Sequence, residues 1–434
     1  MPTRPNVLFV FTDDQRFDTL GALGNDEIRT PNLDELVRTG VTFTHAHIAG
    51  STVPAVCICS RAMLLQGRDL WRAPRDCAEG LATWPETMAR AGYATYGIGK
   101  WHNGAASFAR GFGGGAKVFF GGMSDHRRVP VHDFDPEGRY PKDRQYVGKE
   151  FSSELFSGAA VRFLEAYEGE APFFLYVAYT APHDPRTPPD AYRGMYDAER
   201  LRLPENFMPR HPFDNGELEI RDERLLPWPR TPEAVRAEIA AYYGMISHAD
   251  AQIGRILEAL ERAGHADNTI VIFAGDNGLG VGQHGLLGKQ NLYEHSVRVP
   301  LVIRAPGASP AGARASGLCY LHDLFPTVCD LAGVTIPDTV ESRSLAPVVR
   351  DPSRKGRKAV FAAYRDVQRM VRTERWKLIW YPAIRKVQLF DVAADPKELE
   401  DLSERGEHAD TLGELKARLA AWQAETGDAA PRAA

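Results

Sequence analysis

Two pairs of polar residues have the types and spacing needed to bind a metal ion. Asp13 and Asp14 end one short apolar run, and Asp276 and Asn277 end another. Adjacent carboxylates repel each other unless a cation or a buried base neutralises them. An isolated pair is more often a helix N-cap beside a solvated neighbour. Because the arrangement occurs twice and offers only oxygen ligands, the sequence favours a metal site, with Ca²⁺ or Mg²⁺ preferred over Zn²⁺.

A third chemical candidate is the segment from Cys57 to Arg68, which reads C-I-C-S-R-A-M-L-L-Q-G-R. If this segment is helical, the i and i+4 spacing places Cys57 and Arg61 on one face. A helix N-terminus stabilises anions, so we expect it to lower the pKa of the Cys57 thiol. A buried structural thiol beside a surface arginine is the alternative. One C-x-C pair supplies too few ligands for a zinc or redox site.

The elements that position these residues follow from the pattern of apolar runs. Runs at 7–11, 173–179 and 269–273 each end abruptly in polar residues and predict buried strands that lead into polar loops. Helical patterns lie between them, notably from His248 to Ala263. Strands that alternate with helices predict a parallel α/β sheet. In such sheets the chemistry collects beyond the carboxyl ends of the strands, where the polar residues stand.

The C-terminal part has a different pattern. Residues 369–381 and 386–392 resemble two antiparallel strands, and a helix is expected from about Ala409 to Glu425. We therefore expect a catalytic domain over residues 1–330. A smaller α+β subdomain, built on an antiparallel sheet, is expected over residues 331–434.

Composition excludes several classes of protein. The chain has 434 residues, 44% hydrophobic and 25% charged, with a net charge of -5, which is typical of a soluble globular protein. No basic run favours a nucleic-acid partner, and no apolar stretch approaches the roughly 20 residues of a membrane span. Five cysteines in a long chain do not resemble a disulfide framework. The first apolar run is too short for a signal peptide, so the sequence as written predicts a cytoplasmic protein, or a periplasmic or secreted one if a signal was removed. Composition leaves the oligomeric state open.

Taken in order along the chain, these motifs resemble one family, the formylglycine-dependent sulfatases of the alkaline phosphatase superfamily. The resemblance covers nearly the whole chain and implies an alkaline phosphatase-like α/β fold, with a large central, mostly parallel mixed sheet flanked by helices. It rests on these segments: NVLFVFTDDQR, TPNLDELVRTGVTFTHAH, the C-x-x-S-R-x-x-x-L-x-G-R signature, GIGKWHNG, TAPHDP, GDNGLGVGQHGLLGKQNLYEHSVRVPLVI, VRTERWKLIWY and LFDVAADPKELEDL.

The resemblance implies a role for each matching residue. Calcium, ahead of magnesium, is the expected ion, and its implied ligands are Asp13, Asp14, Asp276, Asn277 and Cys57. Cys57 would be oxidised to formylglycine by a formylglycine-generating or sulfatase-maturating enzyme. The implied sulfate pocket consists of Arg61, Lys100, His102, His183 and Lys289. Taken singly, the last four are equally typical of turns, rigid loops and solvated surface. His284 either orients a metal ligand or packs.

Two positions depart from the family pattern. Cys59 stands where the usual signature has Pro or Ala, and Gln283 stands where a carboxylate commonly precedes His-Gly. The favoured function is hydrolysis of a sulfate ester to an alcohol and inorganic sulfate. A phosphonate monoester or phosphodiester hydrolase on the same fold is one alternative. A non-catalytic sulfate-ester-binding protein is the other, if Cys57 stays a thiol.

Substrate identity rests on analogy alone. The 13-residue step from Asp276 to Lys289 and its GLLGKQNLYE run resemble carbohydrate-type sulfatases, so we expect a small anionic sulfated substrate. One candidate specificity segment is 121–140, with the basic residues His126, Arg127, Arg128 and His132. The other is the insertion at 186–230, which is rich in Pro, Arg and acids and has little periodicity. We expect this insertion to be irregular and to lie near the active-site mouth.

Overall fold

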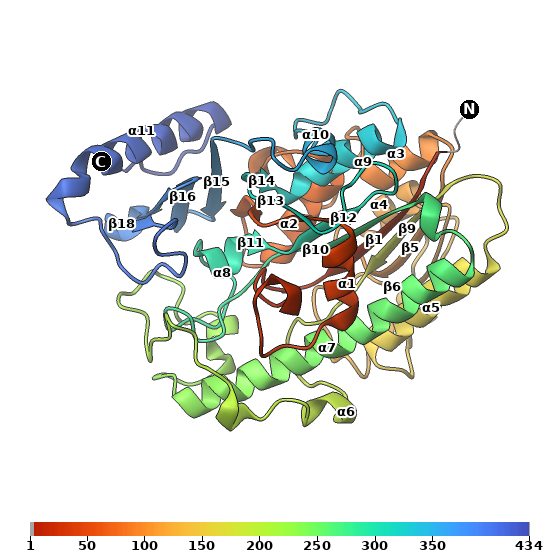
Figure 1. Ribbon diagram of the computed structural model, residues 1–434, viewed down its shortest axis with the longest axis horizontal. Helices are drawn as coiled ribbons and strands as arrows, with labels where there is room; N and C mark the ends of the chain where they lie inside the picture. Colours follow the sequence, from red (N-terminus) through yellow and green to blue (C-terminus); the bar gives the residue numbers. More distant parts are fainter. Residues whose placement is uncertain (1–3, 434) are drawn as a thin grey trace.

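An eight-stranded sheet crosses the middle of the molecule in the computed structural model, which describes residues 4–433 (Figure 1). In spatial order its strands are β13 (Ala313–Ala315), β2 (Val41–Phe43), β12 (Leu301–Arg304), β10 (Thr269–Gly275), β1 (Asn6–Thr12), β9 (Phe173–Ala178), β5 (Ala94–Lys100) and β6 (Gly114–Phe119). Only β12 runs antiparallel to its neighbours in this sheet. The predicted large, mostly parallel mixed sheet is confirmed.

Helices cover both faces of the sheet, and this explains why β1 is apolar at every position from 7 to 11. Successive side chains of a strand point to opposite faces. Val7, Phe9 and Phe11 join one buried cluster, whereas Leu8 and Val10 join another. The first face carries α2 (Val56–Gln66), α3 (Trp84–Arg90), α4 (Ala105–Gly111), α9 (Leu324–Ala332) and α10 (Ala346–Arg350). The second carries α1 (Pro31–Thr39), α5 (Ser152–Ala166) and α7 (Pro232–Arg262).

Helix α7 is longer than the sequence pattern predicts. It begins at Pro232 rather than His248 and ends at Arg262. The Oγ of Thr231 accepts a hydrogen bond from the Ala234 N–H (3.3 Å), and Pro232 occupies the first turn, where its missing N–H costs nothing. The predicted start of this helix is wrong. Thr231 and Pro232, which mark its true start, directly follow the Pro-rich insertion and resemble a part of it.

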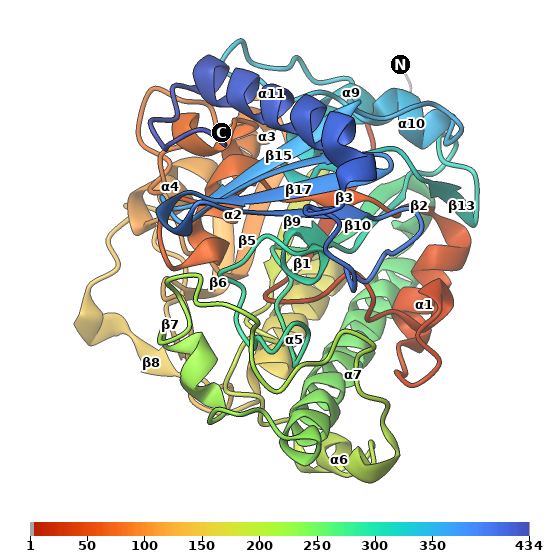
Figure 2. The same cartoon turned by 90° about the vertical axis from the view of Figure 1, so that its left-hand side faces the viewer.

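The C-terminal part contains a five-stranded sheet covered by α11 (Ala409–Thr426), shown in blue in Figure 2. Its order is β18 (Lys386–Asp391), β17 (Trp376–Tyr381), β16 (Gln368–Thr373), β15 (Ala359–Tyr364) and β4 (Gly50–Ser51). The expected strand at 369–381 is two strands, because Thr373 Oγ1 accepts from Trp376 N (2.9 Å) in a turn. The antiparallel sheet and the final helix are confirmed. The division at residue 330 stays a prediction. The C-terminal sheet includes β4, which comes from the part of the chain before residue 330.

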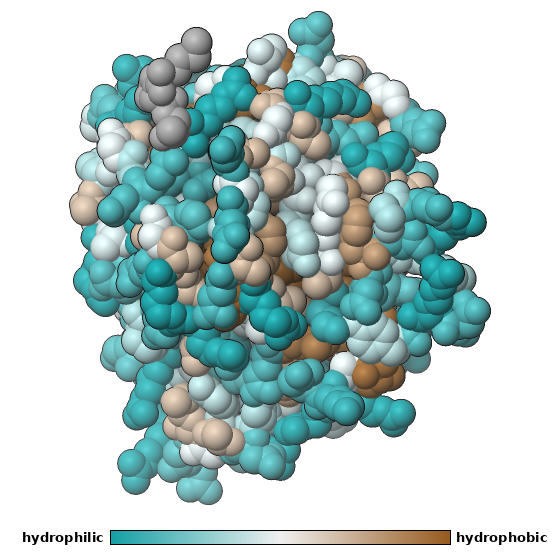
Figure 3. Space-filling model, turned by 90° about the vertical axis from the view of Figure 1, so that its right-hand side faces the viewer, coloured by the Kyte–Doolittle hydropathy of each residue, from teal (hydrophilic) through white to brown (hydrophobic). Residues whose placement is uncertain are grey.

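Smaller elements complete the fold. They are the sheet of β3 (Ala46–His47), β11 (Arg298–Val299) and β14 (Cys319–Tyr320), the pair β7 (Pro130–Val131) and β8 (Tyr146–Val147), and the short helices α6 (Asp190–Arg193) and α8 (Glu294–Val297). Hydrophilic residues cover most of the face in Figure 3, and its hydrophobic areas are small. None of the helices within residues 4–433 is long and apolar enough to cross a membrane.

The buried position of β1 gives a direct stability test. Leu8 is fully buried between the sheet and its helices, whereas Leu399 is 50% exposed. Leu8→Ala should lower the free energy of unfolding by about 2 to 5 kcal/mol, because it removes apolar contacts and leaves a cavity. The matched change Leu399→Ala should cost less than about 0.5 kcal/mol. Urea unfolding followed by circular dichroism measures both, and equal losses would contradict this placement of β1.

Candidate active site

The proposed metal ligands lie where two parallel strands end side by side. In the register of β1 and β10, Thr12 is opposite Gly275, so the residues that follow both strands meet at one edge of the sheet. The Asp276 N–H donates to Thr12 O (3.1 Å), and the Asp14 N–H donates to Asp276 Oδ1 (3.0 Å). Asp14 has a left-handed backbone, with φ of 64°, which turns its carboxylate back toward the site.

Helix α2 brings two more predicted residues to this edge. Cys57 lies in its first turn, and Arg61 follows one turn later. Arg61 Nε donates to Asp276 Oδ2 (2.8 Å), and Ser60 Oγ donates to the Asp276 carbonyl (2.5 Å). The helix ends at Gly67, whose φ of 59° gives a left-handed cap. The start of α2 is therefore anchored on the end of β10.

The surroundings of Cys57 correct one expectation. Its Sγ lies 3.4 Å from His102 Nδ1 and 3.7 Å from Lys100 Nζ. Burial raises the pKa of the Cys57 thiol to about 11, and the cations of Lys100 and Lys289 offset this only in part. The expected lowering of this pKa by the helix N-terminus is wrong, because removal from water is the larger effect. An unmodified Cys57 would be a neutral thiol.

Cations from two further segments pair with the carboxylates. Lys100, the last residue of β5, binds Asp13 and also donates to Gly122 O (2.5 Å). Lys289 Nζ donates to both carboxylate oxygens of Asp14, at 2.7 and 2.9 Å. Burial acts to raise the pKa of Asp13, but the charges of Lys100, His183 and Arg61 hold it well below its usual range.

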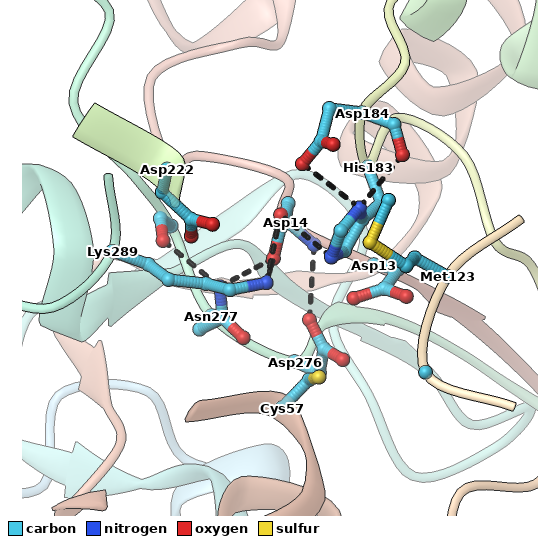
Figure 4. Close-up of polar contacts among 12 residues, drawn as sticks. Asp13, Asp14, Cys57, Met123, His183, Asp184, Asp222, Asp276, Asn277 and Lys289 are labelled. Atoms are coloured by element: carbon cyan, nitrogen blue, oxygen red, sulfur yellow. Dashed lines mark hydrogen bonds and ion pairs between the residues drawn. The ribbon is translucent and has the colours of Figure 1, made fainter. Parts of the chain in front are cut away.

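The remaining oxygens fit a divalent cation. Figure 4 shows Asp13, Asp14, Asp276 and Asn277 pointing toward one another, beside Cys57. Asp13 Oδ1 and Asn277 Oδ1 are buried and have no hydrogen-bond partner within the described part of the chain. Ligand atoms of Asp13, Cys57 and Asp276 lie within 4.8 Å of one another. Burial and the neighbouring Asp13 raise the pKa of Asp276 to about 7. Unsatisfied oxygens and adjacent carboxylates are what a hard cation such as Ca²⁺ would bind.

Two histidines complete the set. His183 lies in the loop after β9, where its Nε2 is 3.6 Å from Asp14 Oδ2 and its Nδ1 is 2.9 Å from Asp184 O. Burial acts to lower the pKa of His183, but Asp14, Asp13 and the contact with Asp184 together raise it. Burial lowers the pKa of His102 to about 2, with further lowering by Lys100 and Arg61. The ring of His102 is therefore neutral, and its Nδ1 faces Cys57 Sγ. All ten residues singled out from the sequence lie in this one site.

Two other histidines lie outside it. His284 stacks on Tyr293, with ring centroids 3.9 Å apart, and its Nε2 is 3.2 Å from Asn206 Nδ2, so it packs. His126 is fully buried, with Nε2 2.9 Å from the His183 carbonyl oxygen. It lies behind His183 and not in the mouth, contrary to its place among the candidate specificity residues.

The sequence reasoning missed four acidic or basic residues around the site. Three of them lie in one turn of the insertion, and its lack of periodicity gave no signal for them. The missed residues are Asp184, Arg221, Asp222 and Glu223.

Comparison with known proteins identifies the family. Residues 5–334 match the family model described as Sulfatase, and residues 282–425 match one described as N-sulphoglucosamine sulphohydrolase, C-terminal. An arylsulfatase of Clostridium perfringens is 30% identical over 95% of this chain and 93% of its own length. An N-acetylglucosamine-6-O-sulfatase of Bacteroides thetaiotaomicron is 27% identical over 99% of this chain and 88% of its own.

A solved structure agrees in fold over the whole length. It is a complex with the substrate D-glucosamine-2-N,6-O-disulfate, has a TM-score of 0.83 and 25% identity, and covers 99% of both chains. Together with the edge-of-sheet site described above, these matches show that the chain belongs to the sulfatase family and is a sulfuric ester hydrolase.

Proposed function

We propose that this sulfatase removes sulfate from a small sulfated carbohydrate, with formylglycine at position 57 and a calcium ion beside it. The observation that carries the proposal is the meeting of four oxygen ligands, Cys57 and a group of cationic and histidine side chains in one buried site. The printed names of a similar enzyme and a similar complex both specify a sulfated glucosamine, which supports a sugar substrate.

Position 57 needs chemistry that a thiol lacks. A sulfur nucleophile would form a sulfur–sulfur adduct with no easy exit. A hydrated formylglycine supplies two hydroxyls on one carbon, so that one can attack sulfur and the other can expel the sulfate. We propose that a maturating enzyme oxidises Cys57 to supply this group, despite Cys59 at a position where Pro or Ala is usual.

The proposed cation site consists of Asp13, Asp14, Asp276 and Asn277, with the residue at position 57. A bound Ca²⁺ would supply positive charge next to the sulfuryl oxygens. Arg61 holds Asp276 in place through the 2.8 Å hydrogen bond from its Nε. The other proposed residues act on the ester or on the group at position 57.

Lys100, Lys289 and His183 are proposed to bind the sulfuryl oxygens, because their nitrogen atoms lie against the carboxylates of Asp13 and Asp14, beside Cys57. Fixed positive groups in a buried site stabilise the charge that develops on these oxygens. His183 or Lys289 would donate a proton to the departing alcohol oxygen. His102 would accept a proton at Nδ1 from the group at position 57, which lies within hydrogen-bonding reach of it.

A substrate panel tests the proposed reaction. The matured, calcium-loaded protein should release sulfate from defined sulfated mono- and disaccharides with a higher kcat/KM than from an aryl sulfate. It should act on an aryl phosphonate monoester more slowly than on either; both kinds of ester carry one negative charge, so this comparison tests the preference for sulfur over phosphorus and not for charge. Ion chromatography of released sulfate measures the first two rates. Faster phosphonate hydrolysis would reverse the assignment in favour of the phosphonate monoester hydrolase alternative.

Replacement of the proposed nucleophile gives a sharp second test. Cys57→Ala should abolish turnover and leave the circular dichroism spectrum that of a folded protein, since the proposed nucleophile is lost but the fold does not depend on it. Cys59→Ala is the matched control, because Cys59 is also buried in α2, and it should retain turnover. Mass spectrometry of the peptide from Val53 to Arg61 should find formylglycine at position 57 in the parent protein. Parent rates in Cys57→Ala would contradict the scheme.

The cation can be tested apart from turnover. Removal of Ca²⁺ with a chelator should abolish activity and lower the melting temperature, because the carboxylates lose the cation that they bind. At a free Ca²⁺ concentration of about 100 times the Kd, binding adds about 2.7 kcal/mol to the free energy of unfolding. Calcium should restore the melting temperature more than magnesium does. Asn277→Ala should remove this calcium-dependent shift, whereas Asn268→Ala, in the exposed turn just before β10, should keep it. A shift that survives Asn277→Ala would contradict this ligand set.

A further inference from the structure

One turn of the insertion, Arg221 to Glu223, contacts both loops that carry the proposed sulfate-binding groups. Arg221 Nη1 and Nη2 donate to the two carboxylate oxygens of Asp184, at 2.6 and 2.7 Å. Asp184 Oδ1 lies 3.2 Å from His183 Nδ1, which is also 2.9 Å from the Asp184 carbonyl oxygen. The two-point contact of Arg221 therefore fixes the carboxylate that faces the His183 ring.

The next residue reaches the loop of Lys289. Asp222 Oδ2 accepts from Gln290 Nε2 (2.8 Å), and Gln290 Oε1 accepts from the Lys289 N–H (3.0 Å). Gln290 Nε2 also donates to Pro54 O (3.0 Å), just before the helix that carries Cys57. Asp222 thus holds the Gln290 side chain, which connects the backbone of Lys289 to Pro54 through its own hydrogen bonds. Figure 4 shows Asp222 beside Lys289, with Asp14 between Lys289 and His183.

The third residue holds the backbone of the same loop. The Glu223 carboxylate accepts from Leu287 N (3.0 Å) and Gly288 N (2.8 Å), and it pairs with Arg230 at 2.7 Å. Glu223 and Arg230 are 3% and 1% exposed, so this charge pair is held inside the protein with its hydrogen bonds made. A Cβ on Gly288 would lie 2.5 Å from Gln290 Oε1 and 2.9 Å from Glu223 Oε1, so a larger residue there would displace the side chains that hold this loop.

We propose that the turn from Arg221 to Glu223 is a positioning element, which sets the placement of His183 and Lys289 relative to each other. The inference rests on the proposed function, since both residues are assigned there to the sulfate group. Arg221 contacts the loop of His183, whereas Asp222 and Glu223 contact the loop of Lys289. A shift of this turn would therefore move both loops. Loss of such supporting contacts typically costs about 10- to 100-fold in activity.

Kinetics of matched variants test the proposal in the matured, calcium-loaded enzyme. Arg221→Gln and Glu223→Gln should each lower kcat/KM for the best sulfated sugar by about 10- to 100-fold. Arg221→Lys keeps the charge but not the two-point contact, and it should not restore the rate. Arg224→Gln is the control, because Arg224 is exposed in the same turn and its Nε donates to Glu219 O (2.6 Å), away from both loops; it should match the parent. Melting temperatures and the formylglycine content of each variant confirm that folded, matured enzymes are compared.

Sulfate binding separates this inference from the proposed function. Calorimetric titration of inorganic sulfate into the calcium-loaded Cys57→Ala protein needs no turnover, and Arg221→Gln or Glu223→Gln in that background should weaken the affinity about 10-fold. If the parent hydrolyses no sulfate ester but these affinities fall, the proposed function fails and the positioning role stands. If the parent is active and both variants keep its kcat, KM and sulfate affinity, the positioning role is overturned. Equal losses in Arg224→Gln would also overturn it, because the turn would then have only a general structural role.

Discussion

The neutralisation of three buried carboxylates is the constraint on which the rest of the site depends. Charges removed from water cost several kcal/mol each unless they are paired and hydrogen-bonded. Each carboxylate has a cation from a different segment: Asp13 pairs with Lys100 from β5, Asp14 with Lys289 from the loop after β10, and Asp276 with Arg61 from α2. The same charges that suit a metal ion therefore also hold separate parts of the chain together at the edge of the sheet.

The direction of the strands makes this meeting possible. Because β1 and β10 are parallel, their carboxyl ends coincide, and the polar residues after both strands become neighbours. An antiparallel pairing would place the residues after β1 beside the start of β10. The C-terminal sheet contacts two of the segments that form this site. Its edge strand β4 lies just before α2 in the chain, and Gln368 of β16 accepts from Leu292 N near the Lys289 loop (3.1 Å).

Much of this arrangement could be predicted from the sequence, and the misses have physical causes. Strands buried on both faces give continuous apolar runs, so the central strands and the residues that follow them were accessible to prediction. The pKa of Cys57 was not, because it depends on how far the folded chain removes the thiol from water. The turn from Arg221 to Glu223 was also missed. Its side chains act through single long-range contacts, which leave no periodic pattern in the sequence.

The charge balance of the site connects its architecture to its proposed substrate. With all three ionised, the carboxylates of Asp13, Asp14 and Asp276 balance the three cations Arg61, Lys100 and Lys289, so these six groups sum to zero. A divalent cation among them would leave the site positive, within a protein whose net charge is -5. A sulfate ester carries one negative charge, and fixed positive groups concentrate such anions locally even on an acidic protein. With such a cation bound, the acidic residues would prepare an anion site indirectly, because the cation would reverse their charge.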